Sequence, residues 1–201
     1  MKFSSLSLQL VAVTVLTTGA AWAQNTPAEQ DQQRDVNQQQ RIEQGLQSGQ
    51  LSTKEAGSLE HQEQHVDNME AHDLKNGPMT AGEQRKLDQA QNRVSNNIYT
   101  DKHNGVTGNP NSASSQRMQA DVQRNVNQQK RIQNGMDNGS LTNHEAGSLE
   151  KGQAHVNGRE ANAARNGHVG AGAQRRIQGA ENHQSGRIYN KKHNGVTKNG
   201  G

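Results

Sequence analysis

One unit is written twice in this chain of 201 residues, in register and without a gap. Residues 35–109 align on residues 125–199 at a constant offset of 90, and 37 of the 75 aligned positions are identical. The block EAGSLE, for example, occupies 55–60 and 145–150. A repeat of this length indicates that one supersecondary unit was duplicated. We therefore predict the fold of one unit and apply it twice.

The first 23 residues have the layout of a secretory signal peptide. Lys2 gives a positive start, residues 6–16 form a short apolar run, and residues 21–23 (Ala-Trp-Ala) form a small-x-small cleavage site. The run is too short to span a membrane, and no Cys follows it for attachment of a lipid. We expect a periplasmic or secreted protein without a membrane span after cleavage.

Each unit carries the start and stop signals of three helices. In the first unit, helices are predicted to start after Thr26, Ser52 and Thr80, each followed three residues later by a Glu that completes a capping box. Glycines at 49, 77 and 105 mark the ends. The expected helices cover residues 27–47, 53–75 and 81–103.

Apolar residues recur at helical spacing, most clearly at steps of three and four from Leu87 to Ile98, whereas alternating strand patterns are nearly absent. We predict an all-α fold of two tandem antiparallel three-helix units. The predicted divisions are a first unit at 24–110, a connecting segment at 111–124 that continues into the next helix, and a second unit at 125–201. Partial disorder is the alternative, because hydrophobic residues make up only 28% of the chain and there is no Cys.

The second unit keeps this plan in a weaker form. Thr142 retains a capping box, but Gly170 and Ala173 replace the residues that would form the last one. Glycines also fall inside the expected helices, and each costs about 1 kcal/mol relative to Ala. These glycines are Gly152, Gly158, Gly179 and Gly186. We predict that the second unit is the less stable.

The repeated block at 98–107 and 188–197 is predicted to end the third helix of each unit. Ile98 and Tyr99 are expected to contact the core, and the Lys-His pair that follows suits the negative end of the helix dipole. Gly105 is expected to supply a left-handed cap. Helix termination therefore explains most of this block.

The two units differ in charge. Residues 35–110 hold 7 Lys/Arg and 11 Asp/Glu, a net charge of −4, whereas residues 125–201 hold 11 and 5, a net charge of +6. Drift of two solvated surfaces explains this difference. The alternatives are attraction between the halves, self-association of two molecules, or binding of a protein or an envelope polyanion. Tyr189 is the only aromatic residue of the basic unit, so we expect no specific nucleic-acid site.

Three segments have a degenerate likeness to EF-hand calcium loops: Gln44–Glu55, His72–Glu83 and Asn134–Glu145. Each has Gly at the sixth place, Ser or Thr at the ninth and Glu at the twelfth. An apolar residue, Leu46 in the first segment, stands at the third place, where calcium needs an oxygen ligand. A glycine stop followed by a capping box accounts for the likeness, and we expect no calcium there.

His61, His65 and His72 are the candidate metal ligands. Steps of four and seven place them along one stripe of a helix, and two His four residues apart can hold Zn or Cu. The second unit has Lys151, His155 and Asn162 at these places, so such a site would belong to the first unit alone. A solvated polar face that happens to contain histidines is the alternative.

No enzyme motif stands out. There is no Cys nucleophile, no Gly-x-Ser-x-Gly elbow and no glycine-rich phosphate loop after a strand. The carboxylates are expected at capping positions or on exposed helix faces. We therefore expect a protein without enzymatic activity.

The pattern Arg-Ile-x-x-Gly-x-x-x-Gly-x-Leu-Ser/Thr occurs at 41–52 and 131–142. It resembles exported proteins of proteobacteria with a duplicated helical repeat, and the resemblance implies that architecture without any activity. We interpret the chain as an exported, non-enzymatic binding, scaffolding or envelope-associated protein. One alternative is a periplasmic divalent-metal-binding protein that uses the histidine stripe, and another is a partly disordered chaperone-like or matrix component.

Overall fold

The computed structural model describes residues 26–198, so the predicted signal peptide lies outside the described residues. The described part contains helices and no strand, which confirms the all-α prediction, and none of its helices combines the length and the apolar character needed to cross a membrane. The helices are α1 (Pro27–Ser48), α2 (Thr53–Asp73), η1 (Leu74–Asn76), α3 (Ala81–His103), α4 (Ala113–Asp137), α5 (Asn143–Ala164) and α6 (Ala171–Lys192).

The predicted helix boundaries follow from local chemistry. The side chains of Thr26, Ser52, Thr80 and Thr142 each accept a hydrogen bond from the backbone N–H three residues on, and the Glu at that place closes a capping box. Gly170 has no side-chain cap, as predicted for the weaker unit. These capping bonds also use the Glu that ends each EF-hand-like segment, which confirms the interpretation as helix starts.

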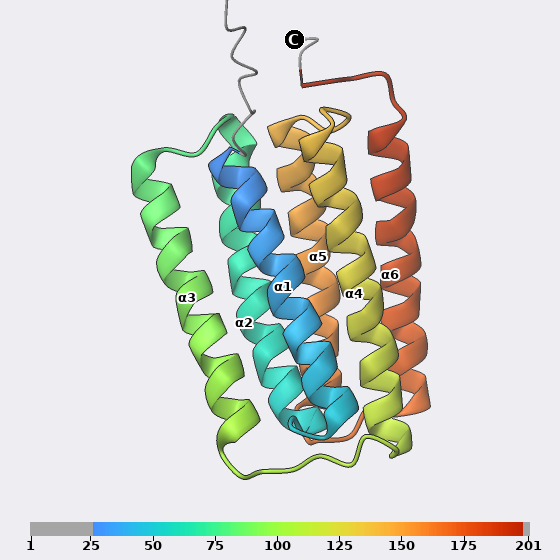
Figure 1. Cartoon of the computed structure of the whole chain (residues 1–201). Coiled ribbons are helices and arrows are strands. Elements are labelled where there is room, and N and C mark those ends of the chain that lie inside the picture. Colours follow the sequence, from blue (N-terminus) through green and yellow to red (C-terminus); the bar gives the residue numbers. More distant parts are fainter. Residues whose placement is uncertain (1–25, 199–201) are drawn as a thin grey trace, which may run out of the picture.

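The two units pack on each other around an approximate two-fold axis (Figure 1). Helix α1 runs antiparallel to α4 and α2 runs antiparallel to α5, while α3 and α6 lie on the outside of this four-helix centre. Equivalent residues meet at the axis, where Asn157 Nδ2 donates to Asp67 Oδ2 over 2.8 Å. The duplication therefore produced two halves that face each other.

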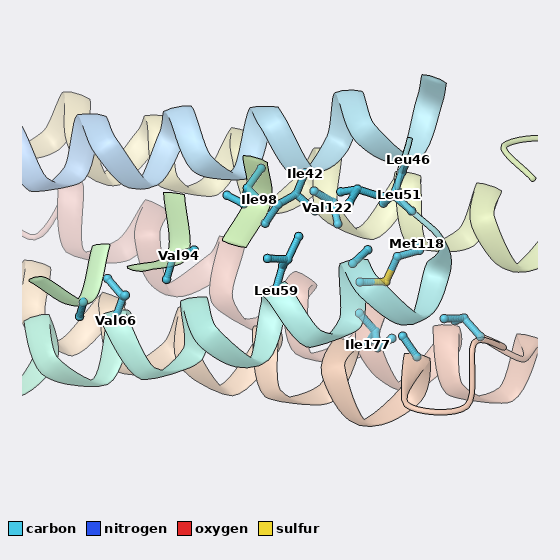
Figure 2. Close-up of a cluster of buried hydrophobic side chains, with 14 of the residues drawn as sticks. Ile42, Leu46, Leu51, Leu59, Val66, Val94, Ile98, Met118, Val122 and Ile177 are labelled. Atoms are coloured by element: carbon cyan, nitrogen blue, oxygen red, sulfur yellow. The ribbon is translucent and has the colours of Figure 1, made fainter. Parts of the chain in front are cut away.

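The hydrophobic core is shared by the two units. In the larger cluster, Leu46 and Leu59 of the first unit pack with Met118 and Val122 of α4, in the connecting segment, and with Ile177 of the second unit (Figure 2). A smaller cluster at the other end combines residues of both units in the same way; it includes Leu74, Ile132, Leu149 and Ile188. An arrangement as two separate three-helix bundles is therefore not confirmed, because each apolar cluster is built from both units.

The repeated EAGSLE block has a packing role at this interface. A Cβ atom added to Gly57 of α2 would lie 2.5 Å from Cβ of Ala164, and one added to Gly147 of α5 would lie 3.0 Å from Cβ of Leu74. Ala164 and Leu74 are themselves equivalent residues of the two units. The block thus contains the glycine that lets α2 and α5 approach each other closely.

The end of the third helix in each unit departs from prediction at one residue. Ile98 is buried, and Gly105 has a φ of 80° as its role at the helix end requires. The core contact predicted for Tyr99 is wrong: its side chain is 62% exposed and its ring stacks on His103, with the centroids 4.3 Å apart. Stacking on His103, one turn along the helix, therefore stabilises the Tyr99 ring at the surface.

Candidate metal centre

Ten carboxylates lie inside the bundle, each no more than 1% exposed. They are Asp31, Asp35, Glu60, Glu63, Asp67, Glu70, Asp121, Glu150, Glu160 and Glu181. Among residues 26–198, no Lys, Arg or His belongs to the buried set. A buried carboxylate is costly in its charged form unless a cation or a set of donors compensates it, so this interior needs either protons or cations.

Helix geometry explains how the acids of the first unit come together. Asp31 and Asp35 are one turn apart on α1, and the acids of α2 follow one another at steps of three and four from Glu60 to Glu70. Those steps belong to a core-facing stripe, and Glu60 directly follows buried Leu59. The expectation that the carboxylates serve as caps or lie on exposed faces is therefore wrong for this set.

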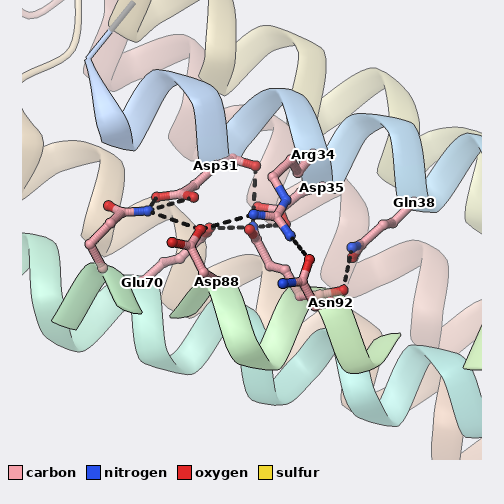
Figure 3. Close-up of polar contacts among 9 residues, drawn as sticks. Asp31, Arg34, Asp35, Gln38, Glu70, Asp88 and Asn92 are labelled. Carbon is pink, nitrogen blue, oxygen red and sulfur yellow. Dashed lines mark hydrogen bonds and ion pairs between the residues drawn. The ribbon is translucent and has the colours of Figure 1, made fainter. Parts of the chain in front are cut away.

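Three of these acids converge tightly. Asp35 of α1 with Asp67 and Glu70 of α2 can each offer an oxygen so that the three atoms lie within 4.8 Å of one another. Gln91 Nε2 donates to Asp35 Oδ1 over 2.9 Å, and Gln32 Nε2 donates to Glu70 Oε2 over 3.0 Å. Figure 3 shows Asp35 and Glu70 near each other among the polar side chains of α1, α2 and α3. We call Asp35, Asp67 and Glu70 the acidic triad.

The region around the acidic triad is short of hydrogen-bond donors. Asp35 Oδ2, Glu63 Oε1 and Glu150 Oε1 are buried without a partner, and so are the amide oxygens of Gln32 and Gln91. Every buried side-chain atom without a hydrogen-bond partner in residues 26–198 is an oxygen. One of them, Oε2 of Glu181, does lie 2.9 Å from Nε of Arg124 in an ion pair. These buried oxygens therefore lack donors, which protons or a positively charged ion would replace.

Burial changes the protonation of these groups. It raises the pKa of Asp35 to about 7 and those of Glu60 and Glu150 to about 8. Burial also raises the pKa of Asp67 well above its usual value, and the charges of the neighbouring carboxylates add to the effect. Burial and the charges of Asp35 and Glu150 also raise the pKa of Glu70, and a hydrogen bond to Asp35 adds to this rise. Without a cation, these groups hold protons near neutral pH.

The structure does not bring the three predicted histidines together. His61 and His65 are exposed on α2, and the step of seven residues from His65 to His72 corresponds to about 10 Å along a helix. His72 instead joins Asp73 and Glu83 in a surface group whose ligand atoms lie within 4.8 Å. Nδ1 of His72 is 2.9 Å from Oδ1 of Asp73, while Glu83 already accepts a bond from the N–H of Thr80.

No family model, curated protein or solved structure matches this chain. The kind of ion that the site could hold is therefore inferred from its ligand atoms and their arrangement. Carboxylate and amide oxygens are the ligands preferred by Ca²⁺, Mg²⁺ and Mn²⁺, and the nitrogen and sulfur ligands that favour Zn²⁺ or Cu are not part of the acidic triad. The interior can therefore exchange protons for a cation that prefers oxygen.

Proposed function

We propose that the protein is an exported, non-enzymatic cation-binding protein, and that the acidic triad holds an ion of the Ca²⁺ or Mn²⁺ class. The observation that carries the proposal is the convergence of Asp35, Asp67 and Glu70 within 4.8 Å, in an interior with unpartnered oxygens and no buried cationic side chain among residues 26–198. An ion at this place would supply the missing positive charge.

The size of the group fits a hard cation. Calcium lies about 2.3–2.6 Å from its oxygen ligands, so two ligands on opposite sides of it are about 4.6–5.2 Å apart. The oxygens of the acidic triad lie within 4.8 Å of one another, so they are close enough to share one ion of this size. Glu63 and Glu150 have buried oxygens without partners and are the next candidates as ligands.

Uptake of the ion would depend on pH. Carboxylates bind metals in the deprotonated form, and burial holds the pKa of Asp35 at about 7. Protons therefore compete with the ion below neutral pH and are released when it binds. A protein of this kind would bind divalent cations at neutral pH and release them at acidic pH.

Thermal unfolding tests the proposal. The metal-free protein at pH 7.5 is expected to gain several degrees in its unfolding temperature with millimolar Ca²⁺ or Mn²⁺, because the ion binds the folded state alone. The double variant Asp35→Asn/Asp67→Asn should lose this response. The control Asp101→Asn/Asp137→Asn, which removes two carboxylates that are not buried, should keep it. No shift in the wild type, or equal shifts in both double variants, would contradict the proposal.

The surface group of His72, Asp73 and Glu83 supports a second candidate, which keeps part of the predicted histidine site. It offers one nitrogen and two carboxylates within 4.8 Å, a set that suits Zn²⁺ better than Ca²⁺. Zinc titration of the His72→Ala variant tests it. A zinc affinity unchanged by that substitution would end this candidate, whereas a further loss in His61→Ala/His65→Ala would extend the site to the whole stripe.

A further inference from the structure

A large groove lies on the second unit, between α5 and α6, and extends to Gln64 and Asn68 of α2. Its volume is 780 Å³, a size typical of ligand pockets. Six of its lining residues are basic or histidine: Lys151, His155, Arg159, Arg176, His183 and Arg187. No Asp or Glu lines it. We call it the basic groove.

The first unit provides a natural comparison for the basic groove. The equivalent place between α2 and α3 is a hollow of only 230 Å³, with His61, His65 and Arg93 among its lining residues. There, Asn97 Nδ2 donates to the Gln62 side chain across the hollow. The corresponding residues of the second unit are Arg187 and Gly152. The second unit has therefore gained both space and positive charge at this place.

Gly152 and Gly179 shape the basic groove. From the sequence alone, they were expected only to destabilise their helices. A Cβ atom on Gly152 would clash with the side-chain ends of Gln184 and Arg187, so the glycine lets those side chains cross α5. Arg187 is then held by Ser148, whose carbonyl oxygen accepts from Nη2 over 2.7 Å. Gly179 has nothing within 4 Å of an added Cβ and leaves its part of the groove open.

Lys151, Arg159 and Arg176 of the basic groove are available to a ligand, whereas Arg187 already donates to the side chain of Gln184 and to Ser148. None of Lys151, Arg159, Arg176 and Arg187 forms an ion pair with a carboxylate of the described residues. Arg159 donates from Nε to Nε2 of His155 over 2.9 Å, which leaves its terminal nitrogens free to bind. Guanidinium groups pair with phosphate oxygens in a bidentate manner.

We propose that the basic groove binds a small anion with two or more phosphoryl groups. A phosphoryl group carries almost two negative charges near pH 7, so two of them can compensate the three available cations in a compact volume, which carboxylates cannot do as densely. No aromatic residue lines the groove, so a nucleoside attached to the phosphates would find no ring to stack on. This inference is independent of the cation site inside the bundle.

Calorimetric titration with tripolyphosphate, at about 0.15 M salt to screen non-specific attraction, tests the proposal. We expect one site per chain, and at least about tenfold weaker binding in Arg159→Gln/Arg176→Gln, because the variant loses charge-assisted hydrogen bonds to the anion. The control Lys86→Gln/Arg93→Gln removes the same charge from the first unit and should leave the affinity unchanged. Equal losses in both variants would show attraction by net charge and overturn the proposal.

Two further comparisons define the ligand and the groove. Citrate should bind at least about tenfold more weakly than tripolyphosphate, and a nucleoside triphosphate should bind no more tightly than tripolyphosphate. Equal binding of citrate would overturn the phosphoryl assignment, and tighter binding of the nucleotide would overturn the assignment to the phosphates alone. Gly179→Gln, which restores the residue type of the first unit, should weaken binding, whereas Gly186→Gln outside the groove should not. Equal affinities in these two variants would place the ligand elsewhere.

Discussion

The two units differ most instructively at the acidic triad. Its counterparts in the second unit are Asn125, Asn157 and Glu160, so two of three carboxylates are replaced by amides of nearly the same shape. Asn125 Nδ2 donates to Glu160 Oε2 over 2.7 Å, and Gln153 Nε2 donates to Asn125 Oδ1 over 2.9 Å. The second unit thus supplies its own donors.

The comparison shows what a duplicated interior can tolerate. Where amides replace acids, the donors come from the protein, and the one remaining carboxylate, Glu160, has its pKa raised by burial and by the acids around it. Where the acids remain, amide donors such as Asn157 and Gln91 supply part of the compensation, and protons or a cation supply the rest. The same backbone positions therefore hold one carboxylate and two amides in the second unit, and three carboxylates in the first.

The pH dependence of stability is the largest expected effect. Burial holds the pKa of Asp31 at about 6, of Asp35 at about 7, and of Glu60 and Glu150 at about 8, all above the values of about 4 expected in the unfolded chain. The folded state then binds more protons than the unfolded state between pH 4 and 8. The metal-free protein should therefore lose stability as pH rises through this range, by on the order of 10 kcal/mol.

Urea unfolding with a chelator at pH 5, 7 and 9 measures this loss. The Asp35→Asn/Asp67→Asn variant, which gives the first unit the amides of the second, should show a shallower decline. A stability that rises with pH, or an equal slope in the variant, would contradict the protonation described for the interior.

The reverse exchange, from amides to acids in the second unit, should destabilise the protein. Asn125→Asp/Asn157→Asp places two more acids beside Glu160, and it removes the Asn125 amide that donates to Glu160 and the Asn157 amide that donates to Asp67. We expect a loss of about 3–5 kcal/mol at pH 8 in the presence of a chelator, the cost of uncompensated buried charge. Chemical unfolding measures the loss, and added Ca²⁺ should restore part of it. A variant as stable as the wild type would show that the two amides do not stabilise this part of the interior.

The close contacts at Gly57 and at Gly147 should differ in how much stability is lost when a methyl group is added. Gly57→Ala should destabilise the protein by about 1–3 kcal/mol, because its Cβ would lie 2.5 Å from that of Ala164. Gly147→Ala should cost less, since its closest neighbour is 3.0 Å away. Thermal unfolding of the two variants measures the difference. A larger cost for Gly147→Ala would reverse this ranking of the two contacts.

The smallest expected effect is at the start of α6. Gly170 has a φ of −77°, which other residues adopt without strain, and it makes no side-chain cap. Gly170→Thr/Ala173→Glu restores the capping box of the first unit and should stabilise the protein by about 1 kcal/mol. Equilibrium unfolding in urea measures the gain. The absence of any gain would show that the missing cap does not limit the second unit.

The helices could be predicted from the sequence because their signals are local. Capping boxes such as Ser52 with Glu55, and stops such as Gly49, act within one turn and read directly from the chain. The pairing of the two units could not be predicted, since it depends on contacts between residues as distant as Gly57 and Ala164. Tyr99 was assigned to the core on hydrophobicity, but a stacking partner one turn away keeps it at the surface.

The candidate site was missed for a physical reason. Charged residues are rarely buried, so Asp35, Asp67 and Glu70 were assigned to solvated faces. Their signal was nevertheless present, because Asp67 and Glu70 continue the three-and-four spacing of the core stripe next to Val66. The histidine stripe was predicted as a metal site from residue type and helical spacing, but one face of a long helix does not by itself bring three ligands to one ion.

The most direct test of the central claim is a count of ions bound and protons released. Equilibrium dialysis of the metal-free protein against Ca²⁺ at pH 7.5, with a pH-stat on the same sample, is expected to show one ion bound at the acidic triad and protons released with it. The Asp35→Asn/Asp67→Asn variant should bind none at that place and release none. Ion uptake without proton release, or uptake unchanged in the variant, would contradict the account.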